Sequence, residues 1–339
     1  MSAVISQTEL RRLVDGWIGQ GVQVAGPRQV KPDHVLYALL NESGQLAMDG
    51  FVRPANSIKE FVYPRHEKLY GYRLNEKEIE LTDVELPAKP QVVLAARPCD
   101  AAALPILDPL FNWDFQDDFY NRRRELTTVV TLACNNHDAH CFCTAVGLAP
   151  DAERGSDAML FDLGDGSYEV RCLTDKGRKL FDGKTQSSDK VGQAKAAPKK
   201  TIDLEKIRSF INGDFESPYW QELTLRCLGC GSCAFTCPTC HCFDIVDEGN
   251  AAGGERVRNW DACQFCLFTK HASGHNPRTA QGQRQRQRVT HKFGIYPDKF
   301  GDILCTGCGN CTRNCPVSLG IFPVLDSIQK VETGAVEAA

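Results

Sequence analysis

The stretch CTGCGNCTRNCP, residues 305–316, repeats the cysteine spacing of an earlier stretch, CLGCGSCAFTCP, residues 227–238. Both follow C-x2-C-x2-C-x3-C-P, the pattern with which bacterial ferredoxins hold iron–sulfur clusters. The first three cysteines of such a run wrap one corner of a cubane, and the fourth points away to a second cluster. The proline that follows ends the tight loop, because it has no N–H to continue a hydrogen-bonded turn.

One copy of the pattern cannot complete a four-cysteine site, so two copies predict two [4Fe–4S] clusters that exchange their fourth ligand. The cysteines of one predicted site are Cys227, Cys230, Cys233 and Cys315. Those of the other are Cys305, Cys308, Cys311 and Cys237. A structural zinc site would need only four cysteines in C-x2-C pairs. Zinc explains neither the third cysteine of each run nor the prolines.

The chain between and around the two copies has helical patterns. The insert between them, 238–304, is longer than the link in a small bacterial ferredoxin and contains QGQRQRQRVTHKF. IDLEKIRSFING precedes the first copy, and FPVLDSIQKVE follows the second. Apolar residues at helical spacing predict helices for these segments. They favour a mainly helical, α-helical ferredoxin-like domain over residues 202–339, in which helix pairs hold the two clusters.

The first half of the chain has a different pattern. Helices are predicted for TELRRLVDGW and DDFYNRRREL, and strands for HVLYALL, QVVLAA and TTVVTLAC. An aspartate–glycine turn makes MLFDLGDGSYEVRCL a hairpin candidate. The predicted fold class is therefore α+β, with an N-terminal α/β-type domain built on a mixed sheet over residues 1–181. Residues 182–201 have hardly any large apolar side chain and are predicted to form a flexible linker.

Composition is that of an ordinary globular protein, with 42% hydrophobic residues, 24% charged residues and a net charge of −4. This balance favours neither a nucleic acid nor a membrane surface as partner. No apolar run is long enough to insert into a membrane, and no apolar segment follows Arg11–Arg12 as a secretory or twin-arginine signal requires. The prediction is a cytoplasmic protein, in which the 17 cysteines are expected to be metal ligands rather than disulfides.

Four cysteines of the first half follow two predicted strands. RPCD places Cys99 after one strand, and CNNHDAHCFC places three more after another: Cys134, Cys141 and Cys143. If the two strand ends converge at one edge of the sheet, these cysteines can hold a third [4Fe–4S] cluster. Arg97, His137 and His140 would then tune its potential. The alternative is that Cys99 and Cys134 are buried structural thiols, but the alternating CFC argues against it.

Four further cysteines lie close to the first ferredoxin run: Cys240, Cys242, Cys263 and Cys266. They are candidates for a fourth cluster or a zinc ion, or they pack beside the neighbouring cluster without binding metal. CPTCH also fits c-type haem attachment, and CPTC fits a thioredoxin motif. Cys237 is already assigned, however, and neither an export signal nor a βαβ setting is present. Cys172 is a lone strand thiol and is predicted to lie in the core.

A basic run also lies near the cysteines: Arg278, Arg284, Arg286 and Arg288 with His291 and Lys292. One interpretation is a solvated helix face. The other is functional, either partial neutralisation of anionic clusters, which raises their potential, or docking of an acidic partner. The sequence leaves these alternatives open.

The landmarks RPCD, CFC, CPTCHCFD, NWDAC, ASGHNPR and RQRVTHKF, with the two ferredoxin runs, resemble the iron–sulfur beta subunits of cytoplasmic sulfhydrogenases. These subunits belong to NAD(P)-linked nickel–iron hydrogenases, and the corresponding iron–sulfur subunit of anaerobic sulfite reductases is similar. The resemblance implies a non-catalytic relay between a flavin subunit that handles NAD(P)H and a hydrogenase-like catalytic subunit. It also implies the additional N-terminal cluster site. Cys266 is not part of the family pattern.

Absences in the sequence agree with a relay. No G-x-G-x-x-G follows a strand, and no convincing acid–base, nucleophile or nickel-ligand constellation is present, so no catalytic residue is expected. Two alternatives remain. One is a self-contained sulfite, polysulfide or disulfide reductase that uses the cysteines near Cys240 and Cys263. The other is a scaffold stabilised by redox-silent zinc.

Overall fold

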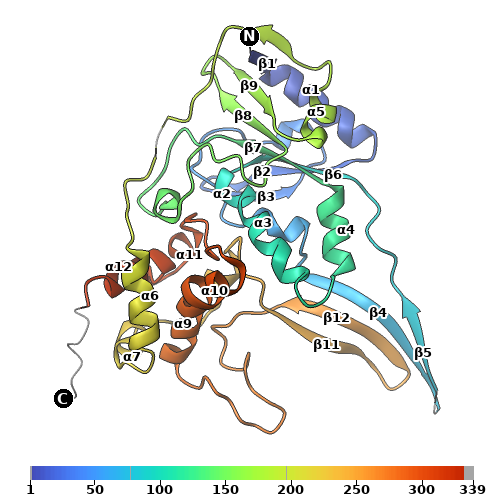
Figure 1. The fold of residues 1–339 in the computed structure, drawn as a ribbon. Coiled ribbons are helices and arrows are strands. Elements are labelled where there is room, and N and C mark those ends of the chain that lie inside the picture. The colour runs from blue at the N-terminus through green and yellow to red at the C-terminus, as the bar shows by residue number, and fades with distance from the viewer. Residues whose placement is uncertain (1, 77, 196, 332–339) are drawn as a thin grey trace.

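The computed structural model describes residues 2–76, 78–195 and 197–331. Within them, the first half of the chain forms an eight-stranded mixed sheet in the order β10-β1-β9-β8-β7-β6-β2-β3 (Figure 1). Its strands are β1 (Ser2–Ser6), β2 (Gln23–Lys31), β3 (His34–Leu39), β6 (Gln91–Ala96), β7 (Thr127–Leu132), β8 (Ala158–Asp162), β9 (Ser167–Cys172) and β10 (Gln186–Ser188). Strands β2, β6, β7 and β8 are parallel to one another, and the outer pairings are antiparallel. The predicted α+β class with a mixed sheet is confirmed.

Both faces of the sheet are covered, which explains why the central strand β6 is apolar after its first residue, Gln91. Val92 and Leu94 of β6 pack in one core with residues of α1 (Gln7–Gly19) and α5 (Asp175–Phe181). Val93 points the other way, into a core shared with the helices on the opposite face. Those helices are α2 (Pro98–Ala101), α3 (Ala103–Leu107) and α4 (Asp118–Leu126).

A second, four-stranded antiparallel sheet joins the two halves of the chain in the order β11-β12-β4-β5. Its strands are β4 (His66–Asn75), β5 (Glu78–Asp83), β11 (Phe243–Asn250) and β12 (Gly253–Trp260). Figure 1 shows the hairpin β11–β12 lying along β4. Part of the insert that was expected to be helical is therefore a β-hairpin. Strand β11, FDIVDEGN, is exposed along nearly its whole length. The hairpin is held by backbone pairing of β11 with β12 and of β12 with β4, which a helix pattern does not reveal.

The segment 182–201, expected to be a flexible linker, is held along the N-terminal sheet in its described part. Strand β10 pairs with β1, and the N–H of Gly192 donates to Glu169 Oε2 at 2.7 Å. Thr144 Oγ1 donates to the carbonyl of Pro198 at 2.6 Å. Such contacts need no large apolar side chains, which is why the composition of the segment gave no sign of them. The domain boundaries at 181 and 202 remain a prediction.

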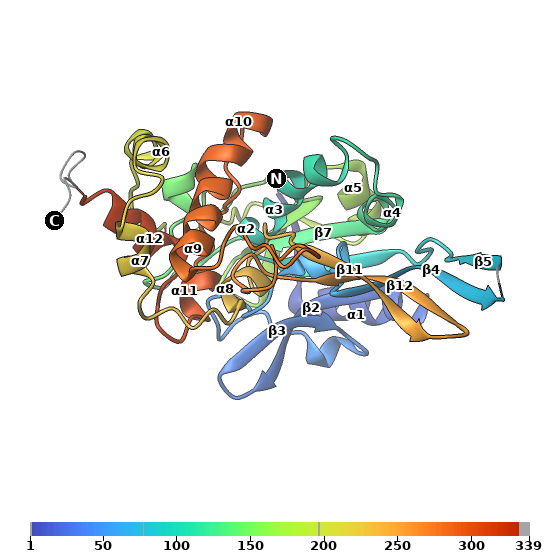
Figure 2. The ribbon, with the colours of Figure 1, turned by 90° about the horizontal axis from the view of Figure 1, so that it is seen from below.

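The second half of the chain packs short helices around a core that also includes Phe142 of the first half. Its helices are α6 (Leu204–Gly213), α7 (Tyr219–Leu223), α8 (Ser232–Phe235), α9 (Gln281–Thr290), α10 (Tyr296–Phe300), α11 (Asn310–Arg313) and α12 (Ile321–Ile328). A π-helical turn, His291–Ile295, joins α9 to α10. Figure 2 shows this region beside the sheets of the first half. In the described part of the chain, every helix falls short of the length or apolarity that crossing a bilayer requires.

Candidate metal centres

The two ferredoxin runs fold into loops with nearly the same backbone. In the first, Gly229 and Gly231 have φ of 64° and 71°, and in the second, Gly307 and Gly309 have 63° and 76°. Only glycine adopts this left-handed region readily, so the glycines on each side of the middle cysteine allow the loop to curl. Each loop leads into a short helix that carries the third cysteine, α8 in the first copy and α11 in the second.

The first pocket, called site 1, is lined by three cysteines of the first run and the last cysteine of the second: Cys227, Cys230, Cys233 and Cys315. The backbone N–H of Leu319 donates to Cys315 Sγ at 3.3 Å. Cys230 is exposed, whereas the other three are half-buried. The grouping predicted from the spacing is therefore the grouping in space.

The second pocket, called site 2, is lined by the complementary set: Cys305, Cys308, Cys311 and Cys237. All four are buried. The N–H of Ile321 donates to Cys311 Sγ at 3.3 Å, and Lys292 Nζ donates to Cys237 Sγ at 3.5 Å. Hydrogen bonds of this kind stabilise the thiolate form that metal binding requires.

The third pocket, called site 3, is lined by the four N-terminal cysteines: Cys99, Cys134, Cys141 and Cys143. Cys99 follows β6 and Cys134 follows β7, two adjacent parallel strands whose ends share one edge of the sheet. Arg97 and His137 also line the pocket, and their role in tuning its potential stays a prediction. His140, predicted for the same role, is not among the described residues that line it.

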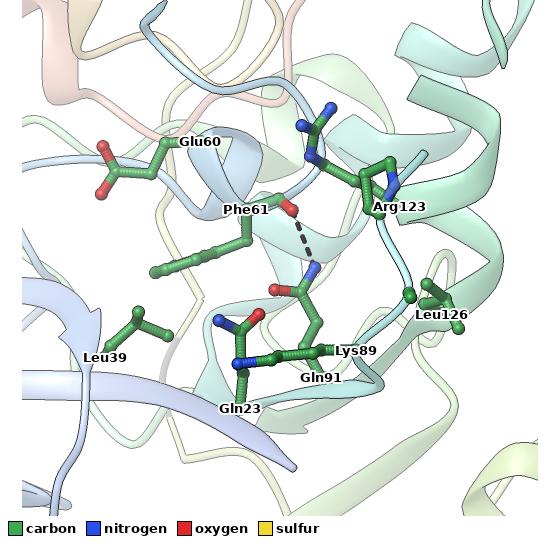
Figure 3. Close-up of a pocket in the computed structure, with 10 residues that line it drawn as sticks. Gln23, Leu39, Glu60, Phe61, Lys89, Gln91, Arg123 and Leu126 are labelled. Carbon is green, nitrogen blue, oxygen red and sulfur yellow. Dashed lines mark hydrogen bonds between the residues drawn. The ribbon is translucent and has the colours of Figure 1, made fainter. Parts of the chain in front are cut away.

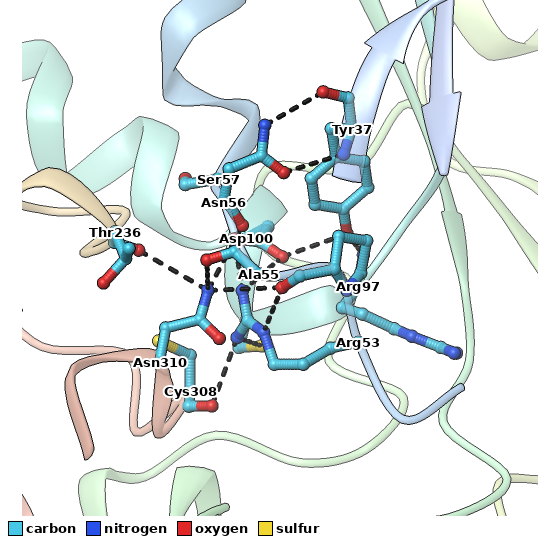
Figure 4. Close-up of polar contacts among 12 residues, drawn as sticks. Tyr37, Arg53, Ala55, Asn56, Ser57, Arg97, Asp100, Thr236, Cys308 and Asn310 are labelled. Carbon is cyan, nitrogen blue, oxygen red and sulfur yellow. Dashed lines mark hydrogen bonds and ion pairs between the residues drawn. The ribbon is translucent and has the colours of Figure 1, made fainter. Parts of the chain in front are cut away.

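Sites 2 and 3 are joined by a buried polar network (Figure 4). Arg53 Nη1 donates to Cys99 Sγ and to the carbonyl of Cys308, both at 3.2 Å. Its Nη2 is 2.8 Å from an oxygen of Asp100, and this ion pair is almost completely buried. Asn310 Nδ2 donates to the carbonyl of Asn56 at 3.2 Å. Neither residue was predicted from the sequence: Arg53 lies outside every cysteine motif, whereas the place of Asn310 inside the second run could have revealed it.

The loop of the second run also packs directly on the CFC segment of site 3. A Cβ on Gly307 would lie 2.5 Å from Cys143 Cα, and one on Gly309 would collide with the carbonyl oxygen of His140. Cys308 lines the pockets of both sites. Site 2 therefore lies beside site 3. It also adjoins site 1, because the short helices α8 and α11 each carry a cysteine of one of these two sites and are followed by a cysteine of the other.

The basic run on α9 and the turn after it is largely buried, so a solvated face is wrong for most of it. Arg284 donates to Gln281 Oε1, and Arg286 pairs with Glu216. In the part of the chain that the structure describes, none of the three guanidinium nitrogens of Arg288 has a hydrogen-bond partner. Arg288 lines site 2. A buried, unpartnered cation beside four thiols fits an anionic iron–sulfur cluster in that pocket.

The remaining cysteine group is divided in space. The Cys242 thiol donates a hydrogen bond to Cys263, which lowers the pKa of Cys263 to about 6. Cys240 is hydrogen-bonded to Cys237 of site 2, whereas Cys266 is exposed. Among the described residues, no three His, Cys, Asp or Glu side chains are gathered as a single metal ion requires. Metal binding by this group stays a prediction. Cys172 is half-buried against the core beneath α1.

Two other pockets lie at the surface. One, of about 390 Å³, is lined by residues such as Phe61, Arg123 and Gln91, whose Nε2 donates to the carbonyl of Phe61 at 2.7 Å (Figure 3). The described residues that line it include no cysteine. The other, of about 640 Å³, lies against site 1 and is lined by Cys227, Cys266 and a mixture of apolar and polar or charged side chains, such as Leu228, Leu267 and Asp261. The second pocket is therefore the one that borders a candidate centre.

The fold and its cysteine pockets define a [4Fe–4S] iron–sulfur protein, and residues 226–319 match the 4Fe-4S dicluster domain family. The chain is 30% identical over 304 residues to sulfhydrogenase 2 subunit beta of Pyrococcus furiosus. The matched region covers 86% of this chain and 88% of that protein. The chain belongs to the sulfhydrogenase beta-subunit family, as the sequence landmarks indicated. No solved structure matches the chain.

The iron content of the purified chain shows how many of the cysteine groups hold a cluster. We expect about twelve iron and twelve sulfide per chain after anaerobic purification, four of each per cubane. About eight of each would mean that site 3 holds no cluster. About sixteen would assign a cluster to the group of Cys240 and Cys263. Chemical analysis of iron and acid-labile sulfide on the same sample provides the measurement.

Proposed function

We propose that this chain is the electron-relay subunit of an oxidoreductase complex, with [4Fe–4S] clusters held by the cysteines of sites 1, 2 and 3. The observation that carries the proposal is the presence of three four-cysteine pockets side by side in one fold. Bound clusters would supply one-electron redox chemistry. The family and its dicluster domain support an iron–sulfur electron-transfer role.

The protein around the three sites supports an order for the relay. The cysteines of site 2 are buried, which keeps water from the middle of the chain of sites. Cys230 of site 1 is exposed, and the cysteines of site 3 are half-buried. We infer that sites 1 and 3 are the ends at which electrons enter and leave, and that partner subunits cover them.

The surface beside site 1 is suited to a partner subunit. Leu225, Leu228 and Leu267 are 79%, 68% and 66% exposed. Leu228 and Leu267 line the pocket of about 640 Å³ that also includes Cys227. Large exposed apolar side chains in a group are typical of protein–protein contacts. We therefore propose this face as the contact with one neighbouring subunit.

The chemistry of the two ends suggests the identity of the partners. The relative is, by its name, one subunit of a sulfhydrogenase. Nicotinamide delivers a two-electron hydride, whereas clusters accept single electrons, and a flavin can divide the pair. Because the sequence has no dinucleotide fingerprint, we propose a flavin subunit that binds NAD(P)H on one side and a hydrogenase-like catalytic subunit on the other.

A direct test is to mix the purified, cluster-loaded chain with NADH or NADPH without oxygen. We expect no change in the visible absorbance, since the sequence has no dinucleotide fingerprint and the proposal places the hydride-accepting flavin in a partner subunit. Dithionite, which donates single electrons, should bleach the same sample and serves as the control. Rapid bleaching by either nicotinamide alone would show that the chain binds the nucleotide itself and would contradict the relay.

A further inference from the structure

Helix α9 and the turn after it place two cations in the interior of the protein. Arg288 and Lys292 are four residues apart and therefore on one face of the helical segment. Each is only 2% exposed, and both line the pocket of site 2. A charge at this depth is unfavourable unless another charge or a set of hydrogen bonds compensates it.

Within the described residues, no carboxylate compensates either charge. In this part of the chain, neither Arg288 nor Lys292 takes part in an ion pair, and the guanidinium of Arg288 has no hydrogen-bond partner. Lys292 Nζ donates to neutral oxygens and to a thiol: Thr239 Oγ1 at 3.0 Å, the Leu304 carbonyl at 2.9 Å and Cys237 Sγ at 3.5 Å. Two other buried cations are paired with carboxylates. Arg53 is neutralised by Asp100, and Arg286 has Glu216.

The titratable groups around both cations are mainly cysteines. Burial would lower the pKa of Arg288, but the thiolates of Cys233, Cys311, Cys240 and Cys237 raise it well above its ordinary value. Arginine stays protonated in proteins. The side chains of Arg288 and Lys292 both line site 2, and Cys233 of site 1 is also close to Arg288.

We propose that Arg288 and Lys292 give site 2 the highest reduction potential of the three sites, so that a single electron in the relay rests in its buried middle. This inference rests on the proposed electron-relay function. Reduction adds one negative charge to a cluster, and burial alone would disfavour that charge at site 2. Two uncompensated positive charges in a low-dielectric pocket reverse the preference.

The surroundings of sites 1 and 3 support a lower reduction potential for both than for site 2. Among the described residues, site 3 has one buried cation without a carboxylate, Arg97, because Asp100 neutralises Arg53. Site 1 shares Arg288 but is open at Cys230. Another buried cation, Lys59, donates to the carbonyl of Cys240 at 2.7 Å and lies over the Trp260 ring; it is not among the described residues that line the pocket of site 2.

The test is a redox titration of the full, cluster-loaded chain followed by electron paramagnetic resonance. The signal of site 2 is the one that Cys237→Ser removes, and we expect it to appear first as the potential is lowered. In Arg288→Gln, the ratio of reduced to oxidised site 2 at a fixed potential should fall by at least about tenfold, because a unit charge has been removed from a buried site. Lys292→Met should act in the same direction, and Arg288→Lys should retain most of the effect.

Arg284→Gln is the matched control. Arg284 lies one turn earlier on α9 and is also buried, but its guanidinium is bound to Gln281 and to the carbonyls of Arg278 and Thr279. We expect its substitution to leave the ratio at site 2 unchanged. The inference is overturned if site 2 is reduced last in the native chain, or if Arg288→Gln and Lys292→Met retain clusters with an unshifted ratio. A purified chain without any cluster signal would instead refute the relay itself, and this inference with it.

Discussion

Replacing Cys315 with serine is expected to remove the cluster of site 1, although Cys315 belongs to the sequence run that builds site 2. The reason is spatial, because Cys315 lines the same pocket as Cys227, Cys230 and Cys233. Cys237→Ser should do the converse and remove the cluster of site 2, since Cys237 lines the pocket of Cys305, Cys308 and Cys311. Each variant should lose about four iron per chain.

Electron paramagnetic resonance of the two variants, beside the native chain, identifies which signal each one loses. Cys172→Ser is the control, since Cys172 lies in β9 and is not among the described residues that line the three pockets. Both ligand variants should also unfold more easily, because cluster binding and folding are linked. If each cysteine affected only the cluster of its own run, the crossed assignment would be wrong.

Replacing Arg53 with methionine should destabilise the protein by about 3–5 kcal/mol, the cost of leaving one charge of a buried pair alone. The Arg53 and Asp100 side chains are 2% and 0% exposed, and Arg53 also contacts Cys99 and Cys308 (Figure 4). Burial already raises the pKa of Asp100, and the charge of Arg53 opposes that effect. Without Arg53, we therefore expect both a lower unfolding midpoint in urea and a weakened cluster at site 3.

Two further variants test whether the loss of stability is specific to the buried Arg53–Asp100 pair. Arg256→Met breaks an ion pair with Asp247 on the exposed hairpin, where both side chains are more than 40% exposed, and should cost less than about 1 kcal/mol. The double variant Arg53→Met, Asp100→Leu removes both charges and should recover much of the stability lost in Arg53→Met. A midpoint for Arg53→Met that equals that of Arg256→Met would contradict the role of the pair.

Much of the candidate site could be predicted because its signals are local. The cysteine spacing specifies which three ligands share a loop, and the fourth follows from the geometry of the run. The glycines around Cys308 report a backbone that only glycine adopts easily. In the same way, the apolar run QVVLAA identified a buried strand, and the cysteine after it marked the edge of the sheet where site 3 lies. Each of these properties depends on a few neighbouring residues.

Other properties depend on segments that are far apart in the chain, and only the tertiary structure decided them. The hairpin β11–β12 pairs with β4, and the segment around β10 with β1, because hydrogen-bonding partners come from another part of the chain. Arg284 and Arg288 look alike in QGQRQRQRVT, yet within the described residues only the Arg284 guanidinium has polar partners. Whether a cation is solvated, neutralised or left facing a cluster depends on what packs around it, and a helix pattern carries no record of that. The same packing places Arg53 between Cys99 and Cys308 and makes site 2 the buried middle of three.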